Sequence, residues 1–142
     1  IIKKLERPII NLHMSYLPFN RGAHPNFWSF MEKTPSGVTL HEIDTGIDTG
    51  KIIVRKKRYF NLKKNSKLTF KRTYKILFEE LEKLLIENLN KLISGNYKCH
   101  KQLGKGTFHL KSDLPTKVLK KWNQNIDKTI LKYKDYHRNE KI

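Results

Sequence analysis

The side chains in this sequence that could perform chemistry are an amide, an imidazole and a carboxylate. Asn11 and His13 lie two residues apart at the end of a short apolar run, and Asp48 follows thirty-five residues after His13. Because side chains two residues apart on a strand share one face, Asn11 and His13 are predicted to point the same way. An acyl-transfer site needs such groups, since an amide N–H and an imidazolium can stabilise an oxyanion and a carboxylate can orient the imidazole.

A buried strand is predicted to carry the first two of these groups. Residues 1–7 resemble the end of a helix that Pro8 stops, and residues 8–12 form a short apolar run without alternation. Such a run is typical of a strand buried on both faces of an α/β sheet, where ligands bind outside the carboxyl ends of the strands. The alternative is a turn in which Asn11 and His13 make ordinary hydrogen bonds.

A loop and a short helix follow this strand. Residues 15–24 have the composition of a loop with one basic residue, Arg21, and Pro25 suits the first position of an apolar helix. Arg21 is either a ligand contact or a solvated charge, and Trp28 is either a stacking platform or a core residue. Residues 38–43 alternate as a strand does, with His41 expected on a sheet face without a chemical role.

The segment 44–50 repeats Asp-Thr-Gly at a spacing of four residues. Aspartic proteases also use this tripeptide, but their two aspartates come from separate lobes or subunits, so the pair Asp44 and Asp48 on one short turn does not fit. Gly46 and Gly50 allow positive φ and close backbone approach, which lets the turn fold over a ligand. Asp48 is preferred over Asp44 as the carboxylate that points inward.

The second half of the chain is expected to be largely helical. Residues 52–62 suggest one strand, with or without a bulge, and residues 69–95 a long amphipathic helix capped by Thr69 and closed by Gly95. Its leucines are expected in the core. Residues 102–109 form a glycine-containing loop that lacks the spacing of a phosphate-binding loop, and residues 116–142 are polar, basic and partly helical.

Composition limits the class of protein. The chain has 142 residues, 37% of them hydrophobic, which is enough for one domain with a modest core. The single Cys99 permits no internal disulfide, and no Cys/His cluster has metal-ligand spacing, so no metal is expected. Since no apolar run suits a signal peptide or a membrane span, we expect no membrane partner and a cytoplasmic location.

The net charge of +17 is confined to one half of the chain. Residues 1–50 hold five basic and five acidic residues, so residues 51–142 hold 25 of the 30 basic residues and 8 of the 13 acidic ones. This charge favours an anionic partner, or it reflects a Lys/Ile/Asn-rich composition on solvated helix faces. Nucleic acid is not the expected partner, because no recognised nucleic-acid motif accompanies the charge.

Several elements in a fixed order resemble the formyltransferase family that uses 10-formyltetrahydrofolate. They are Asn11-x-His13, Ser15-x-Leu17-Pro18, Arg21-Gly22, Gly37-Val38-Thr39 and Asp48-x-Gly50, and they span residues 8–54. Residues 16–30 are similar to the enzymes that formylate amino groups on nucleotide-linked dideoxy sugars, and residues 102–114 to a downstream element of that group. The family's N-terminal strands have no counterpart here, and neither does the tRNA-binding domain of the methionyl-tRNA branch.

The resemblance implies a role for each matching residue. Catalysis falls to Asn11, His13 and Asp48, and binding of the 10-formyltetrahydrofolate cosubstrate to Asp44, Gly46 and Asp48. The residues that would bind the nucleotide-linked amino sugar are Ser15, Arg21, Gly22, His24, Asn26 and Trp28.

The resemblance also implies a fold. It is the C-terminal part of a Rossmann-like α/β domain, with a mixed sheet flanked by helices and a basic helical tail. Residues 1–95 would be an incomplete catalytic domain, inactive alone, and residues 96–142 a sugar-nucleotide-contacting or basic helical extension. Glycinamide-ribonucleotide formylation, methionyl-tRNA formylation and a basic nucleic-acid-binding module remain as alternatives, and the sequence leaves open whether the chain forms a homodimer.

Overall fold

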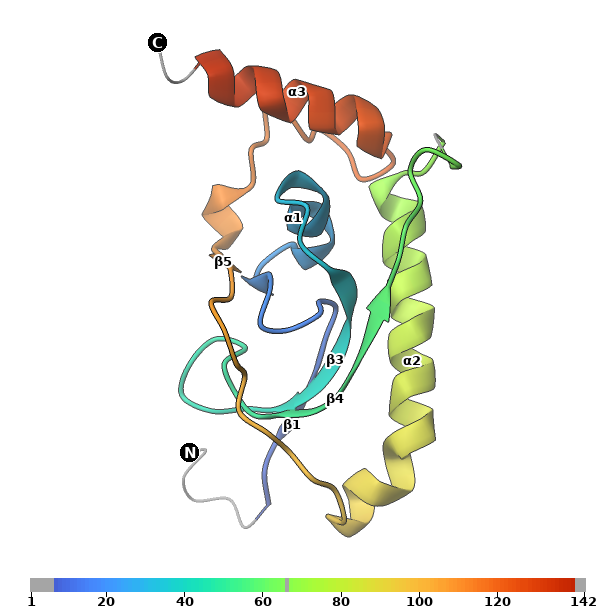
Figure 1. The fold of residues 1–142 in the computed structure, drawn as a ribbon, viewed down its shortest axis with the longest axis vertical. Helices are drawn as coiled ribbons and strands as arrows, with labels where there is room; N and C mark the ends of the chain where they lie inside the picture. Colours follow the sequence, from blue (N-terminus) through green and yellow to red (C-terminus); the bar gives the residue numbers. More distant parts are fainter. Residues whose placement is uncertain (1–6, 66, 140–142) are drawn as a thin grey trace.

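A computed structural model describes residues 7–65 and 67–139 (Figure 1). The helix predicted to end at Pro8 falls almost entirely on residues 1–6, outside the described residues. The elements in chain order are β1 (Ile10–His13), β2 (Arg21–Gly22), α1 (Pro25–Met31), β3 (Ser36–Glu42), β4 (Ile52–Arg58), α2 (Phe70–Ser94), β5 (Phe108–His109), the 3-10 turn η2 (Lys111–Asp113) and α3 (Ile126–Asn139). The predicted α/β class is confirmed.

A three-stranded sheet in the order β1-β3-β4 holds the predicted chemistry. Both strand pairs are antiparallel. The expectation that the first strand is buried on both faces is wrong for this structure, because Ile9 and Leu12 are each 40% exposed. The cause is that β1 lies at the edge of the sheet, whereas α2 packs against β3 at the centre.

Helix α2 runs along one face of the sheet and begins and ends where predicted (Figure 1). The Thr69 side chain caps it by accepting from the Arg72 amide, and Gly95 ends it with φ 72°. Leu77, Leu81 and Leu84 pack on Val38 and Leu40 of β3 in one core cluster. Tyr74, Phe78 and Leu89 are instead 42–49% exposed, so only part of the apolar stripe faces the sheet.

The strand predicted for residues 52–62 ends at Arg58. Its partner β3 begins at Ser36, which pairs with Arg58, so later residues have no strand to pair with. Phe60 turns toward Phe30 of α1, with ring centroids 5.7 Å apart. The four cationic residues that end β4, residues 55–58, lie along an edge strand, where charge discourages pairing with another chain.

A second core cluster joins α1 to α3 and to the N-terminal end of α2. Phe27, Trp28, Phe70 and Ile126 are among its buried residues. The segment after α2 crosses back to the opposite side of the molecule, where β5 pairs in parallel with β2 (Figure 1). Within the described residues this is the sole parallel pair of strands. The predicted sheet was mixed, whereas here the antiparallel pairs lie in one sheet and the parallel pair in another.

Candidate active site

Strand register brings the predicted catalytic residues together. Asn11 of β1 lies opposite His41 of β3, and His13 lies opposite Thr39, so all four side chains share one face. Asp48 reaches this face from the loop between β3 and β4 and has φ 53°, a left-handed conformation that is rare outside glycine.

Asp48 is the centre of the cluster. Its Oδ1 accepts a hydrogen bond from Asn11 Nδ2 at 3.1 Å, and its Oδ2 accepts from the Gly22 backbone N–H at 2.8 Å. His13 Nδ1 lies 3.5 Å from Oδ2, and His41 Nε2 lies 3.5 Å from Oδ1. An amide, two imidazoles and a carboxylate therefore form one connected site.

His41 is a member of this site that the sequence interpretation missed. It is buried, at 1% exposure, and its Nδ1 lies 2.7 Å from the Glu42 carbonyl oxygen, so Nδ1 carries a proton. In the neutral ring Nε2 then accepts from Asn11 Nδ2 at 3.1 Å, and in the protonated ring it can donate to Asp48. The signal was present in the sequence, because Thr39 and His41 are polar residues at alternate positions of a buried strand.

Both nitrogens of His13 face acceptors. Nε2 lies 3.1 Å from the Asn20 carbonyl oxygen and Nδ1 faces Asp48, so the imidazolium satisfies both contacts. Burial nevertheless lowers the pKa of His13 below its usual value, against the opposing effects of Asp48 and the Asn20 carbonyl and with a smaller contribution from His41. The ring is therefore neutral near pH 7 and available to accept a proton.

Asp48 stays ionised in this setting. Burial alone would raise its pKa, but hydrogen bonding by His41, the charge of His13 and the Gly22 N–H together hold the pKa of the carboxyl below its ordinary value. An ionised Asp48 can stabilise the imidazolium that forms when His13 takes up a proton.

Gly46 and Gly50 of the 44–50 loop are required because other atoms lie close to them, not because they adopt positive φ. A Cβ on Gly50 would lie 1.7 Å from the Glu42 carbonyl oxygen, and one on Gly46 would lie 2.1 Å from Thr49 Oγ1. The positive φ in the loop belongs to Asp48, not to a glycine. Asp44 closes the loop on itself by accepting from the Gly46 N–H and the Thr49 hydroxyl, so its carboxylate shapes the loop.

Two of the predicted substrate contacts lie at the edge of this cluster, and a third is buried. Gly22 donates to Asp48, and the neighbouring Arg21 guanidinium is held by Gln102 Oε1 at 2.8 and 3.0 Å. Ser15 is 1% exposed, and within the described residues its Oγ has no hydrogen-bond partner. The structure therefore places the Ser15 hydroxyl in the interior.

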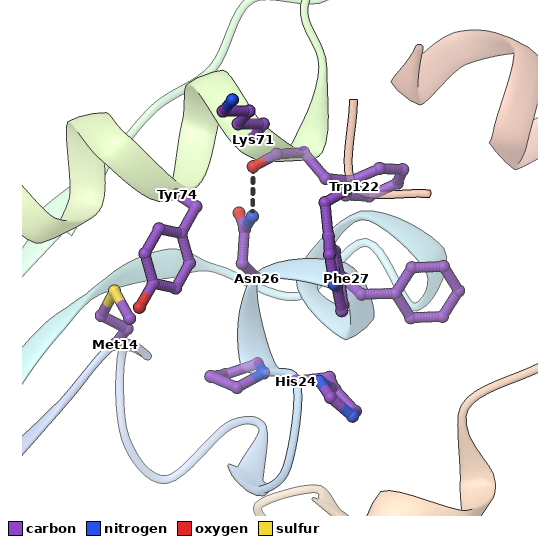
Figure 2. Close-up of a pocket in the computed structure, with 9 residues that line it drawn as sticks. Met14, His24, Asn26, Phe27, Lys71, Tyr74 and Trp122 are labelled. Atoms are coloured by element: carbon purple, nitrogen blue, oxygen red, sulfur yellow. Dashed lines mark hydrogen bonds between the residues drawn. The ribbon is translucent and has the colours of Figure 1, made fainter. Parts of the chain in front are cut away.

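A cavity of about 570 Å³ is lined by Met14, which follows His13 in the sequence. Figure 2 shows Met14 and Tyr74 on one side of it and Trp122 on the other. His24 lines the cavity, with its ring 5.4 Å from that of Trp122. Burial, with a smaller effect of Lys111, lowers the pKa of His24. An aromatic wall of this size suits a planar ligand group.

The other two predicted substrate contacts have structural partners. Asn26 also borders the cavity, but its amide donates to the Phe70 carbonyl oxygen and accepts from Thr73 Oγ1, which ties α1 to α2 (Figure 2). Trp28 is 5% exposed and stacks on His109 at 3.8 Å, away from this cavity. The structure therefore does not bring Trp28 to the candidate site.

Neither a metal-ligand cluster nor a membrane-spanning helix occurs among the described residues. Across residues 7–65 and 67–139, no group of three or more His, Cys, Asp or Glu side chains is arranged to hold a metal ion. No helix in the same ranges has the length and apolar character needed to cross a membrane.

The fold and the site define a small α/β domain with a buried centre suited to acyl-group transfer. The chain belongs to the formyl transferase family, because the model of that family matches residues 1–83, more than half of the sequence. The predicted family resemblance is therefore confirmed.

Solved and curated relatives agree with this assignment. The crystal structure of the formyltransferase PseJ from Anoxybacillus kamchatkensis, in complex with UDP-4,6-dideoxy-4-formamido-L-AltNAc and tetrahydrofolate, has a TM-score of 0.78 and 38% identity, covering 84% of this chain and 63% of that one. The dTDP-4-amino-4,6-dideoxyglucose formyltransferase of Mycobacterium bovis is 40% identical over 48 residues, 34% of this chain and 20% of its own length.

The methionyl-tRNA branch is also similar. The methionyl-tRNA formyltransferase of Solibacter usitatus is 41% identical over 59 residues, which are 41% of this chain and 19% of that protein. The chain thus spans less than two thirds of PseJ and about a fifth of these two curated relatives.

Proposed function

We propose that the protein transfers the formyl group of 10-formyltetrahydrofolate to the amino group of a nucleotide-linked amino sugar. The observation that carries this proposal is the convergence of Asn11, His13 and Asp48 in one connected cluster. A UDP-linked sugar and tetrahydrofolate bound to PseJ, at 38% identity, support the same substrate classes.

His13 is the proposed general base. When the cosubstrate is bound, it supplies the formyl carbon. A neutral amine forms a new C–N bond to this carbon, the bond from the carbon to N10 of the cosubstrate breaks, and tetrahydrofolate leaves with one proton on N10, which the His13 imidazolium can return. The amine must then lose a proton, and His13, kept neutral by burial, accepts it, while ionised Asp48 stabilises the resulting imidazolium. Asp48 also fixes the ring's position, since its second oxygen is anchored by Asn11.

Asn11 is the proposed oxyanion donor, but its two N–H groups are engaged with Asp48 and His41 in this structure. Stabilising an oxyanion therefore requires one of them to change partner. The contact with His41 is the one to release, because the contact with Asp48 anchors the carboxylate that faces His13.

The loop 44–50 is the proposed folate contact. Asp44 and Gly46 hold its shape, and Asp48 points from it into the site. Ile47 at its tip is 56% exposed and offers apolar surface to a planar ring. We also propose that the chain alone is inactive and that residues 96–142 supply contacts to the sugar nucleotide.

The cavity beside Met14 is the proposed site for the nucleotide part of the acceptor. Trp122 is 43% exposed there, and its carbonyl oxygen is fixed by the Lys71 backbone N–H at 2.8 Å. A base can stack on the exposed ring, and the Lys71 side chain can attract phosphate.

The proposal is tested with the protein extended to the length of its PseJ-type relatives. The wild type is expected to transfer formyl to a UDP- or dTDP-linked amino sugar, and His13→Ala and Asp48→Ala to lose most of this turnover without unfolding. Loss of one preorganised site group typically costs about 2.7 to 4 kcal/mol of barrier, or about 10²- to 10³-fold in rate. Near-wild-type transfer by the His13→Ala protein contradicts the mechanism.

Two further measurements test the acceptor. The first tests the cavity: Trp122→Ala is expected to weaken binding of the sugar nucleotide, measured by calorimetry, with the exposed Leu103→Ala as control. The second compares acceptors. Formylation of methionyl-tRNA or of glycinamide ribonucleotide in preference to the amino sugar contradicts the proposed acceptor. Salt-dependent binding of nucleic acid without any response to reduced folate favours the basic-module alternative.

A further inference from the structure

Gln102 makes four hydrogen bonds that join two parts of the active site. Its Nε2 donates to the carbonyl oxygens of Asp48 and Gly50, each at 2.8 Å. Its Oε1 accepts from Arg21 Nε at 3.0 Å and from Nη2 at 2.8 Å. Both donors and both acceptor positions of one amide are thus in use, although Gln102 lies 54 residues after Asp48 in the sequence.

These bonds close a ring around the catalytic carboxylate. Gln102 holds the main chain of Asp48 and the side chain of Arg21. Gly22, the residue after Arg21, donates its N–H to Asp48 Oδ2 at 2.8 Å. Asp48 is therefore fixed by its backbone on one side and by its carboxylate on the other. This matters because its φ of 53° is strained for a residue with a side chain and persists only where neighbours hold it.

We propose that Gln102 is a positioning residue for the formyl-transfer site: it holds the Asp48 loop and Arg21 in register so that the carboxylate faces His13. The inference rests on the proposed function for its catalytic meaning, but the geometric claim concerns only His13, Asp48 and Gln102. Within the described part of the chain, no hydrogen bond joins Gln102 to Asn11 or His13, so its effect on the chemistry is transmitted through Asp48.

The amide is the group that this place requires. A carboxylate at position 102 would keep the contact with Arg21 through one oxygen but would turn its other oxygen toward the carbonyls of Asp48 and Gly50. A methionine has a similar length and makes neither set of bonds. Since the two carbonyls need donors and the guanidinium needs an acceptor, only a side chain carrying both can satisfy this ring.

The test measures the pKa of His13 by NMR titration of the imidazole resonances, assigned with a His13→Gln variant. The groups that face His13 are Asp48, the Asn20 carbonyl oxygen and His41, whose ring lies 6.1 Å away. Because Asp48 raises the pKa of His13, Asp48→Asn is expected to lower it, and Gln102→Met is expected to lower it by part of that amount. Lys101→Ala, an exposed neighbour, serves as control.

A double-mutant cycle separates positioning from a general structural effect. In the Asp48→Asn background, Gln102→Met is expected to leave the pKa of His13 unchanged, since the charge it positions is gone. If the methionine variant does not fold, the cycle is repeated with Gln102→Glu, which retains the Arg21 contact. This variant is measured with Asp48 present and in the Asp48→Asn background. An equal decrease in both backgrounds, or no decrease in either, overturns the proposal.

Kinetics supply the second readout. In the extended active protein, Gln102→Glu is expected to lower kcat on the order of 10- to 100-fold, as misplacement of a catalytic group does. KM for the acceptor should change much less, because the Arg21 contact is kept. If no formyl transfer is found at all, the proposed function fails while the titration still decides whether Gln102 positions Asp48.

Discussion

Thr39→Val is expected to destabilise the protein strongly although it keeps the branched shape of the side chain. Thr39 is fully buried, and its hydroxyl donates to the Ser15 carbonyl oxygen at 2.7 Å while accepting from the Leu17 N–H at 3.3 Å. Valine leaves the buried Leu17 N–H unpaired, at a cost of about 1–3 kcal/mol, and removes a bond worth about 0.5–1.5 kcal/mol net. The expected loss is therefore about 1.5–4.5 kcal/mol, a large part of a typical stability of about 5–15 kcal/mol.

Urea unfolding monitored by the fluorescence of Trp28 and Trp122 measures this loss. Thr39→Ser keeps the hydroxyl and should retain most of the stability, whereas Thr116→Val, at an exposed position, should stay within about 0.5 kcal/mol of the wild type. A Thr39→Val protein as stable as the wild type, with the same dependence on urea, would refute the reasoning that this hydroxyl fixes the loop after β1.

Other contacts of the site and the core lead to three more predictions. Burial lowers the pKa values of His13 and His24 in the folded protein relative to the unfolded chain. The free energy of unfolding should therefore be highest above pH about 6.5 and should decrease as the pH falls from there through the pKa values of the folded state. In urea titrations at several pH values, His13→Gln should reduce this pH dependence. Asn26→Ala should lower the stability by about 2–3 kcal/mol, because it removes two buried hydrogen bonds between α1 and α2, as measured by urea unfolding. Gly50→Ala should shift the catalytic loop and lower the thermal midpoint, since its Cβ would overlap the Glu42 carbonyl oxygen; an unchanged midpoint in calorimetry would count against so close an approach of the two backbone segments.

The parts of the molecule that the sequence predicted well depend on local signals. Thr69 and Gly95 mark the ends of α2 because capping is decided within a few residues. Asn11 and His13 share a face because alternation along one strand is also local, and the family resemblance added Asp48. Local patterns and one resemblance are therefore sufficient to identify three side chains of the site.

The parts that were missed depend on pairing between distant segments. His41 joins the site because β1 and β3 align in one register among several that the sequence permits. Gln102 lies in the segment that resembles a downstream element of the family, but its hydrogen bonds to Asp48 and Arg21 depend on tertiary packing that the sequence does not show. Trp28 depends on the same kind of pairing, since its ring packs on His109 of β5, and its role as a substrate contact stays a prediction.

The pairing of β5 with β2 has a consequence for how the protein is made. Arg21 and Phe108 are partners, so the two strands must find each other across most of the chain. Contacts of such long range slow folding, and synthesis proceeds from the N-terminus. A nascent chain that stops before Gln102 already carries Asn11, His13 and Asp48, yet it lacks the amide that joins the Asp48 loop to the Arg21 side chain. During translation, the reactive side chains are therefore synthesised before the residue that aligns them.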